Sequence, residues 1–179
     1  MRVIGGEFRS RAIKSLPGLD VRPTPGRLRE ALFNILTPRI EGAIFADLYA
    51  GTGAVGIEAL SRGAARAIFV EQKHAAVKAI RENLRSLGIE SRAEVRQGRV
   101  TAMIPRIEAG IVFLDPPYAL ENEYAAALEL LGETPPRLAI AQHPPRLQLA
   151  ESYGALHRMR LVKHGDNAFS FYEPAAVTD

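Results

Sequence analysis

The 179-residue chain predicts a single α/β domain built on a Rossmann-like sheet of about seven strands. Short apolar runs alternate with segments of helical periodicity from residue 43 to residue 141, which is the pattern of repeated strand–helix units. Such units form a mostly parallel sheet with helices on both faces. A glycine-rich turn follows the first of these strands, and a two-stranded hairpin near the end of the chain suggests an antiparallel edge.

The first forty residues read as a basic extension in front of these units. They hold eight arginine and lysine residues against three acidic ones, whereas the whole chain has a net charge of only +3. Such a segment is typical of an arm that faces nucleic-acid phosphates, although a solvated charged face has the same composition. We therefore divide the chain into a phosphate-facing extension, residues 1–40, and a second part, residues 41–179, within one compact unit.

Each element is predicted from its periodicity and its turn residues. In the extension, β-like pieces around residues 3–4 and 11–14 predict a hairpin arm. A helix then begins with Thr24 as its N-cap and Pro25 at its first position, and it ends at Pro38. The expected strands cover residues 44–49, 67–71, 93–96, 111–114, 138–141, 156–163 and 168–172. The expected helices of the second part cover residues 54–62, 75–87, 100–104 and 123–131.

The composition excludes several classes of protein and site. No cysteine is present, so disulfides and thiolate metal sites are excluded, and the four histidines lack metal-ligand spacing. No apolar run approaches the roughly 20 residues of a membrane-spanning helix, and the first residues lack the apolar stretch of a signal peptide. We therefore expect a soluble cytoplasmic protein without a metal.

The glycine-rich turn after the first expected strand predicts a nucleotide cofactor. Gly51, Gly53 and Gly56 match the spacing of the dinucleotide-binding fingerprint, and they open a helix. Glu71 lies twenty residues beyond Gly51, at the end of the second expected strand, where its carboxylate would accept hydrogen bonds from both ribose hydroxyls. These features fit either NAD or S-adenosylmethionine.

Asp47, at the end of the first expected strand, distinguishes these two cofactors. A dianionic pyrophosphate would be repelled by a carboxylate four residues before the first glycine. S-adenosylmethionine has no phosphate, and its sulfonium and ammonium groups are cationic, so the same carboxylate favours it. Asp47 is alternatively a cap for the amides of the loop, and the two roles are compatible.

The tetrapeptide Asp115-Pro116-Pro117-Tyr118 follows the buried strand expected over residues 111–114, at the end of the sheet where α/β proteins bind ligands. The carboxylate of Asp115 can accept a hydrogen bond from an amine, and the two prolines hold the backbone stiff. Tyr118 offers a flat face on which a base can stack. The tetrapeptide suits an enzyme that acts on the exocyclic amine of a nucleobase, and a structural turn with a packed tyrosine is the alternative.

With both motifs in place, the chain resembles the RsmD-type 16S rRNA (guanine-N2) methyltransferases over nearly its whole length. The glycine turn and the Asp-Pro-Pro-Tyr motif are shared with many methyltransferases, whereas the N-terminal signature narrows the resemblance to this family. The segments that carry the resemblance are residues 2–6, 22–24, 27–34, 47–53, 56–64, 115–118 and 169–172.

The resemblance implies a class I methyltransferase that transfers a methyl group from S-adenosylmethionine to N2 of a guanine, guanine 966, in 16S rRNA. Asp115 and the carbonyl of Pro116 would hold the amine, Pro117 would stiffen the turn, and Tyr118 would stack on the base. The cofactor contacts that we expect are Asp47, Tyr49, Ala50, Gly51, Gly53, Glu71, Gln72, Gly98 and Asp115. The RNA contacts that we expect are Arg9, Arg11, Lys14, Arg22, Arg27 and Arg29.

Two stretches depart from the family pattern. Gln97-Gly98-Arg99 stands where members often carry a side chain that meets the adenine amine, so backbone groups are expected to recognise the adenine. Gln142-His143 stands where a Glu-His pair is usual, a change that keeps hydrogen bonding and removes a charge. The implied partner is 16S rRNA, either naked or within a small-subunit assembly intermediate, and we expect a monomer.

Three other functions share parts of this pattern. An adenine-N6 nucleic-acid methyltransferase would use the same tetrapeptide. An NAD-dependent oxidoreductase would account for the glycines and Glu71 but leave Asp47 and the tetrapeptide unexplained. A non-catalytic RNA-binding or assembly protein would keep the fold without methyl transfer.

Overall fold

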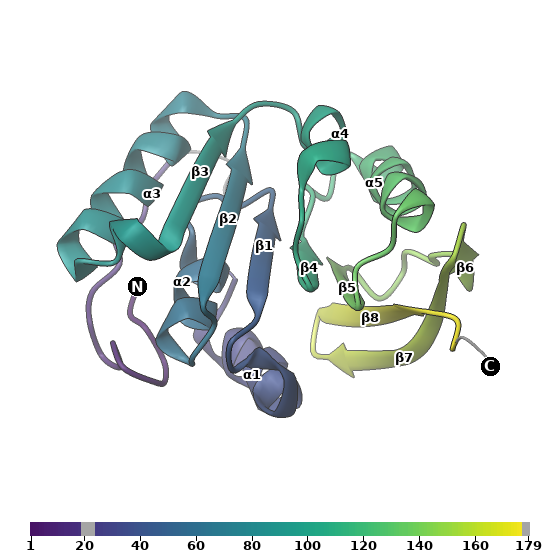
Figure 1. Cartoon of the computed structure of the whole chain (residues 1–179), viewed down its shortest axis with the longest axis horizontal. Helices are drawn as coiled ribbons and strands as arrows, with labels where there is room; N and C mark the ends of the chain where they lie inside the picture. Colours follow the sequence, from purple (N-terminus) through teal and green to yellow (C-terminus); the bar gives the residue numbers. More distant parts are fainter. Residues whose placement is uncertain (19–23, 177–179) are drawn as a thin grey trace.

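The computed structural model describes residues 1–18 and 24–176, and an eight-stranded sheet lies at its centre (Figure 1). The strands lie side by side in the order β3-β2-β1-β4-β5-β8-β7-β6. They are β1 (Ile44–Leu48), β2 (Arg66–Glu71), β3 (Ala93–Gln97), β4 (Ile111–Leu114), β5 (Leu138–His143), β6 (Ser152–Tyr153), β7 (Leu156–His164) and β8 (Asn167–Pro174). The first five strands in this order are parallel, and the last three pair antiparallel, so the predicted fold class is confirmed.

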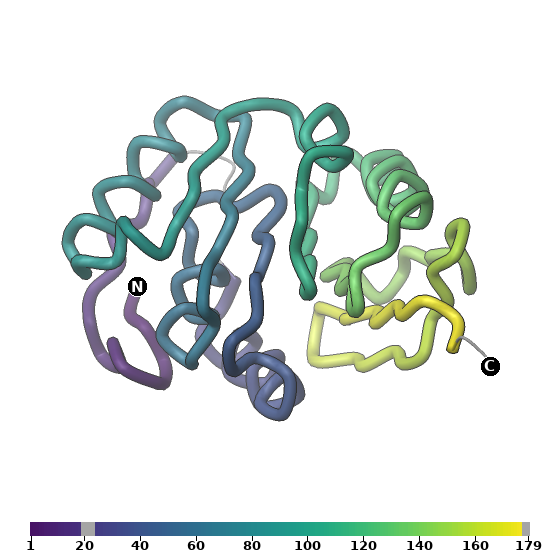
Figure 2. The backbone as a smooth tube through the Cα atoms, viewed as in Figure 1, coloured from purple at the N-terminus to yellow at the C-terminus, as the bar shows by residue number. Residues whose placement is uncertain are grey.

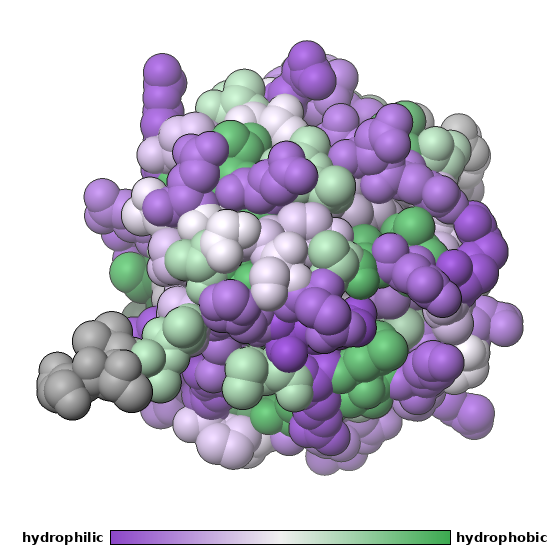
Figure 3. All heavy atoms as spheres, turned by 90° about the vertical axis from the view of Figure 1, so that its right-hand side faces the viewer, coloured by the Kyte–Doolittle hydropathy of each residue, from purple (hydrophilic) through white to green (hydrophobic). Residues whose placement is uncertain are grey.

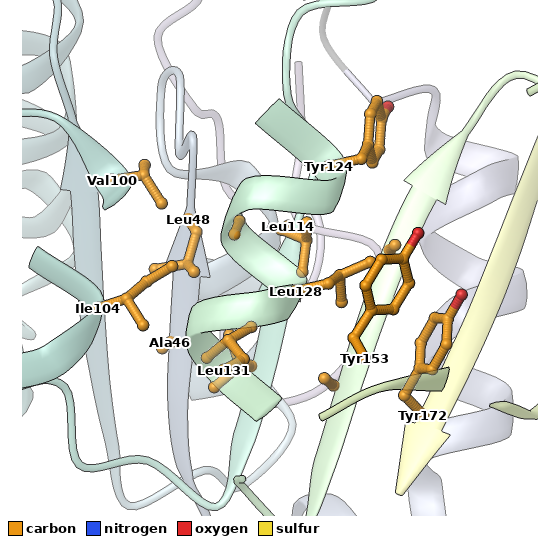
Figure 4. Packing of buried hydrophobic residues seen from close by; sticks show 14 of the residues in the cluster. Ala46, Leu48, Val100, Ile104, Leu114, Tyr124, Leu128, Leu131, Tyr153 and Tyr172 are labelled. Carbon is orange, nitrogen blue, oxygen red and sulfur yellow. The ribbon is translucent and has the colours of Figure 1, made fainter. Parts of the chain in front are cut away.

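Helices cover both faces of the sheet. They are α1 (Gly26–Ile40), α2 (Ala54–Ser61), α3 (His74–Leu87), α4 (Val100–Met103) and α5 (Glu121–Glu133), with short 3-10 turns η1 (Glu90–Arg92) and η2 (Ile104–Arg106). Side chains alternate along each strand, so Phe45 packs toward α1 and α2, whereas Leu48 packs toward α4 and α5. Figure 4 shows the second of these contacts, with Leu48, Leu114 and Leu128 in one apolar cluster. Two apolar layers therefore hold the sheet between α1–α3 and α4–α5.

The predicted elements of the second part agree with the observed ones to within two residues at either end. Three short elements of this part, β6 and the 3-10 turns η1 and η2, were not predicted, because runs of two or three residues are too short to show a periodic pattern.

Helix α1 differs from its predicted boundaries. Thr24 and Pro25 precede the helix, Pro25 occupies the N-cap position without a side-chain cap, and Pro38 lies inside the last turn. A proline removes one helical hydrogen bond, and this loss is small so near the end of the helix. Ile40 is buried in the core beyond Pro38, and its packing keeps the last turn helical. The predicted cap and the predicted end at Pro38 are therefore wrong.

The N-terminal segment packs on the body of the protein, next to α2 and α3 (Figure 2). Among the described residues its β pairing is one bridge between Arg2 and Ala12, so the expected hairpin arm is reduced to a single contact. The side chains that bury this segment are Val3, Phe8 and Ile13.

Two buried polar side chains attach this segment to the rest of the molecule. Glu58 of α2 accepts hydrogen bonds from the amides of residues 4–5 at 2.9 and 2.8 Å. Asn83 of α3 accepts a hydrogen bond from the amide of Lys14 at 2.7 Å and donates one to the carbonyl of Thr52 at 3.0 Å. Because Thr52 lies in the glycine turn, the N-terminal segment and that turn share one buried side chain.

The surface at the antiparallel end of the sheet is mixed in character. Figure 3 shows hydrophobic residues there as separate spots among hydrophilic ones. Within the described ranges, every helix is either too short or too polar to cross a membrane.

Candidate functional site

A cleft of about 750 Å³ opens at the carboxyl ends of the central strands. Its walls come from the segments that follow β1, β2 and β4, from the end of β5, and from residues next to the beginnings of α1, α4 and β8. In an open α/β sheet ligands bind at this edge, at the point where the strand order reverses. The glycine turn and the Asp-Pro-Pro-Tyr motif therefore border the same cavity.

Of the predicted catalytic and cofactor-binding residues, ten line this cleft and two do not. Those in the lining are Asp47, Tyr49, Ala50, Gly51, Glu71, Gln72, Asp115, Pro116, Pro117 and Tyr118. Gly53 lies behind the turn, where an added Cβ would be 3.3 Å from the side chains of Ile80 and Phe69. Gly98 donates its amide hydrogen to the carbonyl of Glu71 at 3.1 Å and packs closely on Met103. Both glycines shape the backbone around the cleft without bordering it.

The glycine turn contains three residues with left-handed backbone. The φ angles are 60° at Tyr49, 59° at Gly51 and 84° at Gly53. A tyrosine in this region is unusual and indicates that its surroundings hold it there. The Tyr49 hydroxyl donates a hydrogen bond to Glu123 of α5 at 2.7 Å, and burial together with this bond raises the pKa of Tyr49. Glu123 thus anchors one wall of the cleft, a role that the sequence did not suggest.

Asp47 caps the helix that follows the turn. Gly53 is the N-cap of α2 and has no side chain, so Asp47 of β1 instead accepts the amide hydrogen of Gly56 at 2.9 Å. Burial raises the pKa of Asp47 well above its ordinary value, and the charges of Asp115 and Glu71 raise it further against the opposing hydrogen bond. The capping role considered from the sequence is therefore present, and the carboxylate also borders the cleft.

Glu71 holds the turn with both carboxylate oxygens. It accepts the amide hydrogen of Gly51 at 2.8 Å and that of Lys73 at 2.9 Å. Each carboxylate oxygen has a second lone pair, so two hydroxyl donors can still bind. The side chain is buried but borders the cleft, which suits the predicted contact to a ribose.

The hydrogen bonds of the turn disfavour a pyrophosphate. Dinucleotide-binding proteins present amides at the helix N-terminus to phosphate oxygens. In this chain the amide of Gly51 is bound to Glu71, that of Gly53 to the Ala50 carbonyl, and that of Gly56 to Asp47. Carboxylates occupy the positions that phosphates would need, so the turn is built for a ligand without phosphate.

The Asp-Pro-Pro-Tyr motif forms another part of the cleft wall. Asp115 is half-buried directly after β4, and its amide donates a hydrogen bond to the carbonyl of Leu48. The hydroxyl of Tyr118 donates a hydrogen bond to the side-chain oxygen of Asn167 at 2.5 Å. Asn167 begins β8, so the antiparallel edge orients the tyrosine ring. In the sequence Asn167 looked like an ordinary turn residue, and no local signal marked it as part of the site.

The predicted RNA contacts have different surroundings. Arg9 and Arg27 are exposed, and Lys14 is exposed and paired with Glu82 at 2.5 Å. Arg11, also exposed, donates a hydrogen bond to the carbonyl of Ser86 at 3.1 Å. Arg22 lies outside the described residues.

Arg29 does not fit its predicted role as a phosphate contact. Its side chain is 1% exposed, and it donates hydrogen bonds to the backbone carbonyls of Thr24 at 2.8 Å and Arg2 at 2.7 Å. Burial lowers the pKa of Arg29, and the charge of Glu58 opposes that effect. Helical spacing turned this arginine inward, and it joins the N-terminal segment to α1. The prediction for Arg29 is therefore wrong.

Within residues 1–18 and 24–176, histidine, aspartate and glutamate side chains form no group of three or more that could hold a metal ion. His143 is buried, with its ring nitrogens 2.8 Å from the Ser170 hydroxyl and 3.0 Å from the Pro144 carbonyl.

Comparisons with known proteins agree with this geometry. YlbH of Bacillus subtilis (strain 168), a candidate rRNA methyltransferase, is 34% identical over 97% of this chain and 98% of that protein. The ribosomal RNA small subunit methyltransferase D of Escherichia coli (strain K12) is 38% identical over 66% of this chain, and the match spans 60% of that protein. Among solved structures, the candidate methyltransferase YhhF from Escherichia coli has a TM-score of 0.83 at 31% identity and covers 98% of both chains.

A family model described as "Conserved hypothetical protein 95" matches residues 1–173. The fold is that of the class I S-adenosylmethionine-dependent methyltransferases, including the antiparallel edge. The chain therefore belongs to the conserved hypothetical protein 95 family, the family of the RsmD-type rRNA methyltransferases.

Proposed function

We propose that this rRNA methyltransferase transfers the methyl group of S-adenosylmethionine to the exocyclic N2 amine of a guanine in 16S rRNA, at the position corresponding to guanine 966. One observation carries the proposal. The carboxylate of Asp115 borders the same cleft as those of Asp47 and Glu71, so an amine and a cationic cofactor would lie within reach of each other.

The chain's residues fit S-adenosylmethionine, which is the cofactor. Three carboxylates, those of Asp47, Glu71 and Asp115, border the cleft, and burial together with the charges of the other two raises the pKa of Asp47. A sulfonium and an ammonium group would relieve this repulsion, whereas a pyrophosphate would increase it. Glu71 has lone pairs left for the ribose hydroxyls. When bound, the cofactor supplies a methyl carbon that its sulfonium already activates, and the electron pair of the broken bond stays on sulfur.

Asp115 and the carbonyl of Pro116 prepare the amine. The lone pair of guanine N2 is delocalised into the ring, so N2 is a poor nucleophile. If Asp115 accepts one N–H and Pro116 the other, the lone pair turns out of the ring plane toward the methyl carbon. The methylated nitrogen then gives up a proton to Asp115 or to water.

Tyr118 holds the base. Stacking of a base on an aromatic ring contributes about 1–3 kcal/mol. The hydrogen bond from Tyr118 to Asn167 fixes the ring before the base arrives, so less conformational freedom is lost on binding. The base must be unstacked from its neighbours to enter the cleft.

The RNA would lie across the basic N-terminal part. Arg9, Arg11, Lys14 and Arg27 are exposed there, and we assign residues 1–40 to this RNA-facing role. The substrate is naked 16S rRNA or a small-subunit assembly intermediate, and the enzyme acts as a monomer.

The test is methyl transfer from labelled S-adenosylmethionine to small-subunit particles that lack the modification, with Asp115→Ala in parallel. We expect N2-methylguanosine from the parent protein and at least a 100-fold lower rate from the variant, because the lone pair is no longer directed. Cofactor binding, measured by calorimetry, separates loss of chemistry from loss of the cofactor.

Two results would count against the proposal. Label in N6-methyladenosine would replace guanine by adenine and keep the chemistry. Cofactor binding without any labelled nucleoside, on both particles and naked rRNA, would favour a non-catalytic RNA-binding role.

A further inference from the structure

The end of β5 contributes a polar side chain to the cleft next to Asp115. β4 and β5 are parallel neighbours, and Leu114 is in register with Ala141, so Asp115 and Gln142 occupy neighbouring positions at the same edge. Adjacent strands lie about 4.8 Å apart. Phe113 and Ile140, two residues earlier on each strand, pack into one core cluster, which shows that Asp115 and Gln142 also share a face.

The side-chain oxygen of Gln142 is buried and has no hydrogen-bond partner among the described residues. Gln142 is only 3% exposed, yet it borders the cleft. The strand around it is fixed, because the Tyr124 hydroxyl donates to the Gln142 backbone carbonyl at 2.8 Å. A buried acceptor without a partner costs about 1–3 kcal/mol, and such groups in native proteins call for an explanation such as a ligand.

The chemistry of the bases identifies a donor for this oxygen. In guanine one of the two ring nitrogens beside the exocyclic amine, N1, carries a hydrogen. In adenine and cytosine the ring nitrogen beside the amine carries none and is an acceptor. An acceptor placed next to the group that holds the amine therefore favours guanine and opposes the other two bases.

We propose that Gln142 is the specificity-determining residue of this methyltransferase: its side-chain oxygen accepts the N1–H of the target guanine while Asp115 holds the N2 amine. This inference rests on the proposed function. With the Gln142 amide oriented as the structure has it, adenine N1 would face the side-chain oxygen and leave it unpaired, so the site disfavours adenine.

The test compares Gln142→Met, Gln142→Glu and the parent protein in methyl transfer to particles that lack the modification. Methionine keeps the length of the side chain and removes the acceptor, so we expect kcat/KM to fall about 10- to 100-fold. Glutamate keeps an acceptor at this position, so kcat/KM should recover to within about 10-fold of the parent. Gln148→Met makes the same change at an exposed glutamine outside the cleft and should have no effect.

Two readouts separate recognition from folding. The melting temperature and the affinity for S-adenosylhomocysteine should be no lower in Gln142→Met than in the parent, because no described residue donates a hydrogen bond to this oxygen. Gln142→Leu provides a second apolar variant should the methionine fail to pack.

The outcomes are distinguishable. If the parent forms N2-methylguanosine and both apolar variants keep its kcat/KM, Gln142 does not read the base and this inference alone is overturned. If the parent forms N6-methyladenosine, or no methylated nucleoside, the proposed function fails and this inference fails with it. A loss in the apolar variants with recovery in Gln142→Glu supports it.

Discussion

At the scale of single residues, Asp47 shows a conflict between function and stability. The residue is only 2% exposed and lies near the carboxylates of Asp115 and Glu71. Burial is the main cause of its raised pKa. A carboxyl group whose pKa is higher in the folded than in the unfolded state destabilises the fold once it ionises. Its hydrogen bond to Gly56 needs only an acceptor, which an amide also provides. The charge therefore matters for the ligand and not for the fold.

We expect Asp47→Asn to stabilise the protein without ligand and to weaken cofactor binding. At pH 7 the melting temperature should rise by about 2–4 °C, the equivalent of about 1 kcal/mol, whereas affinity for S-adenosylmethionine should fall at least 10-fold. The gain in stability should vanish below about pH 4, where the unfolded carboxyl group is also protonated, and should grow as the pH rises.

Thermal scans from pH 3 to 8 and calorimetric titrations with the cofactor measure both effects. Asp166→Asn, in the exposed turn between β7 and β8, is the matched control and should change neither. A destabilised Asp47→Asn protein at pH 7 would contradict the electrostatic account.

At the scale of elements, the packing of α2 against β2 sets the position of the glycine turn. The third glycine of the motif, Gly56, lies on the inner face of α2, where an added Cβ would be 2.3 Å from the ring of Phe69. This glycine therefore serves the approach of helix to sheet and does not touch the cleft.

Gly56→Ala should destabilise the protein by about 1–3 kcal/mol, because the ring of Phe69 is held within the core and cannot move away without strain. Gly110→Ala is the matched control, since its added Cβ has no neighbour closer than 4.0 Å. Urea unfolding of the two variants measures the difference. Equal stability of both would mean that α2 can shift freely on the sheet.

At the scale of the whole molecule, the basic charges of the N-terminal part serve two purposes. Arg27 is exposed on α1, and Arg29, two residues later, is buried and holds backbone carbonyls. Only exposed arginines can release counterions from RNA phosphates.

Arg27→Ala and Arg29→Met should therefore change different properties: the first the salt dependence of RNA binding, the second the stability of the fold. Loss of Arg27 should reduce the slope of log affinity for rRNA against log salt by about 0.7–0.9 and leave the melting temperature unchanged. Loss of Arg29 should lower stability by about 1–3 kcal/mol, because two carbonyls lose their donor, and leave the slope unchanged. Filter binding at several salt concentrations and thermal scans test both. A reduced slope in a stably folded Arg29→Met protein would restore that residue as a phosphate contact.

The sequence by itself determined the order and type of the longer helices and strands from Ile44 onward, but not the two-residue β6, and it determined the two motifs that border the cleft. These follow from periodicity and turn residues, which act between positions close together in the chain. The boundaries of α1 were predicted less well, because burial of Ile40 outweighed the local effect of Pro38.

Only the tertiary structure decided which distant residues meet. Arg29 turns inward to the N-terminal segment, and Asn167 holds Tyr118 because β8 pairs with β5. Gln142, whose side-chain oxygen has no hydrogen-bond partner among the described residues, likewise lies beside Asp115 only because β4 and β5 are neighbours. Strand order is a long-range property of the chain, so no local pattern in the sequence contains these contacts.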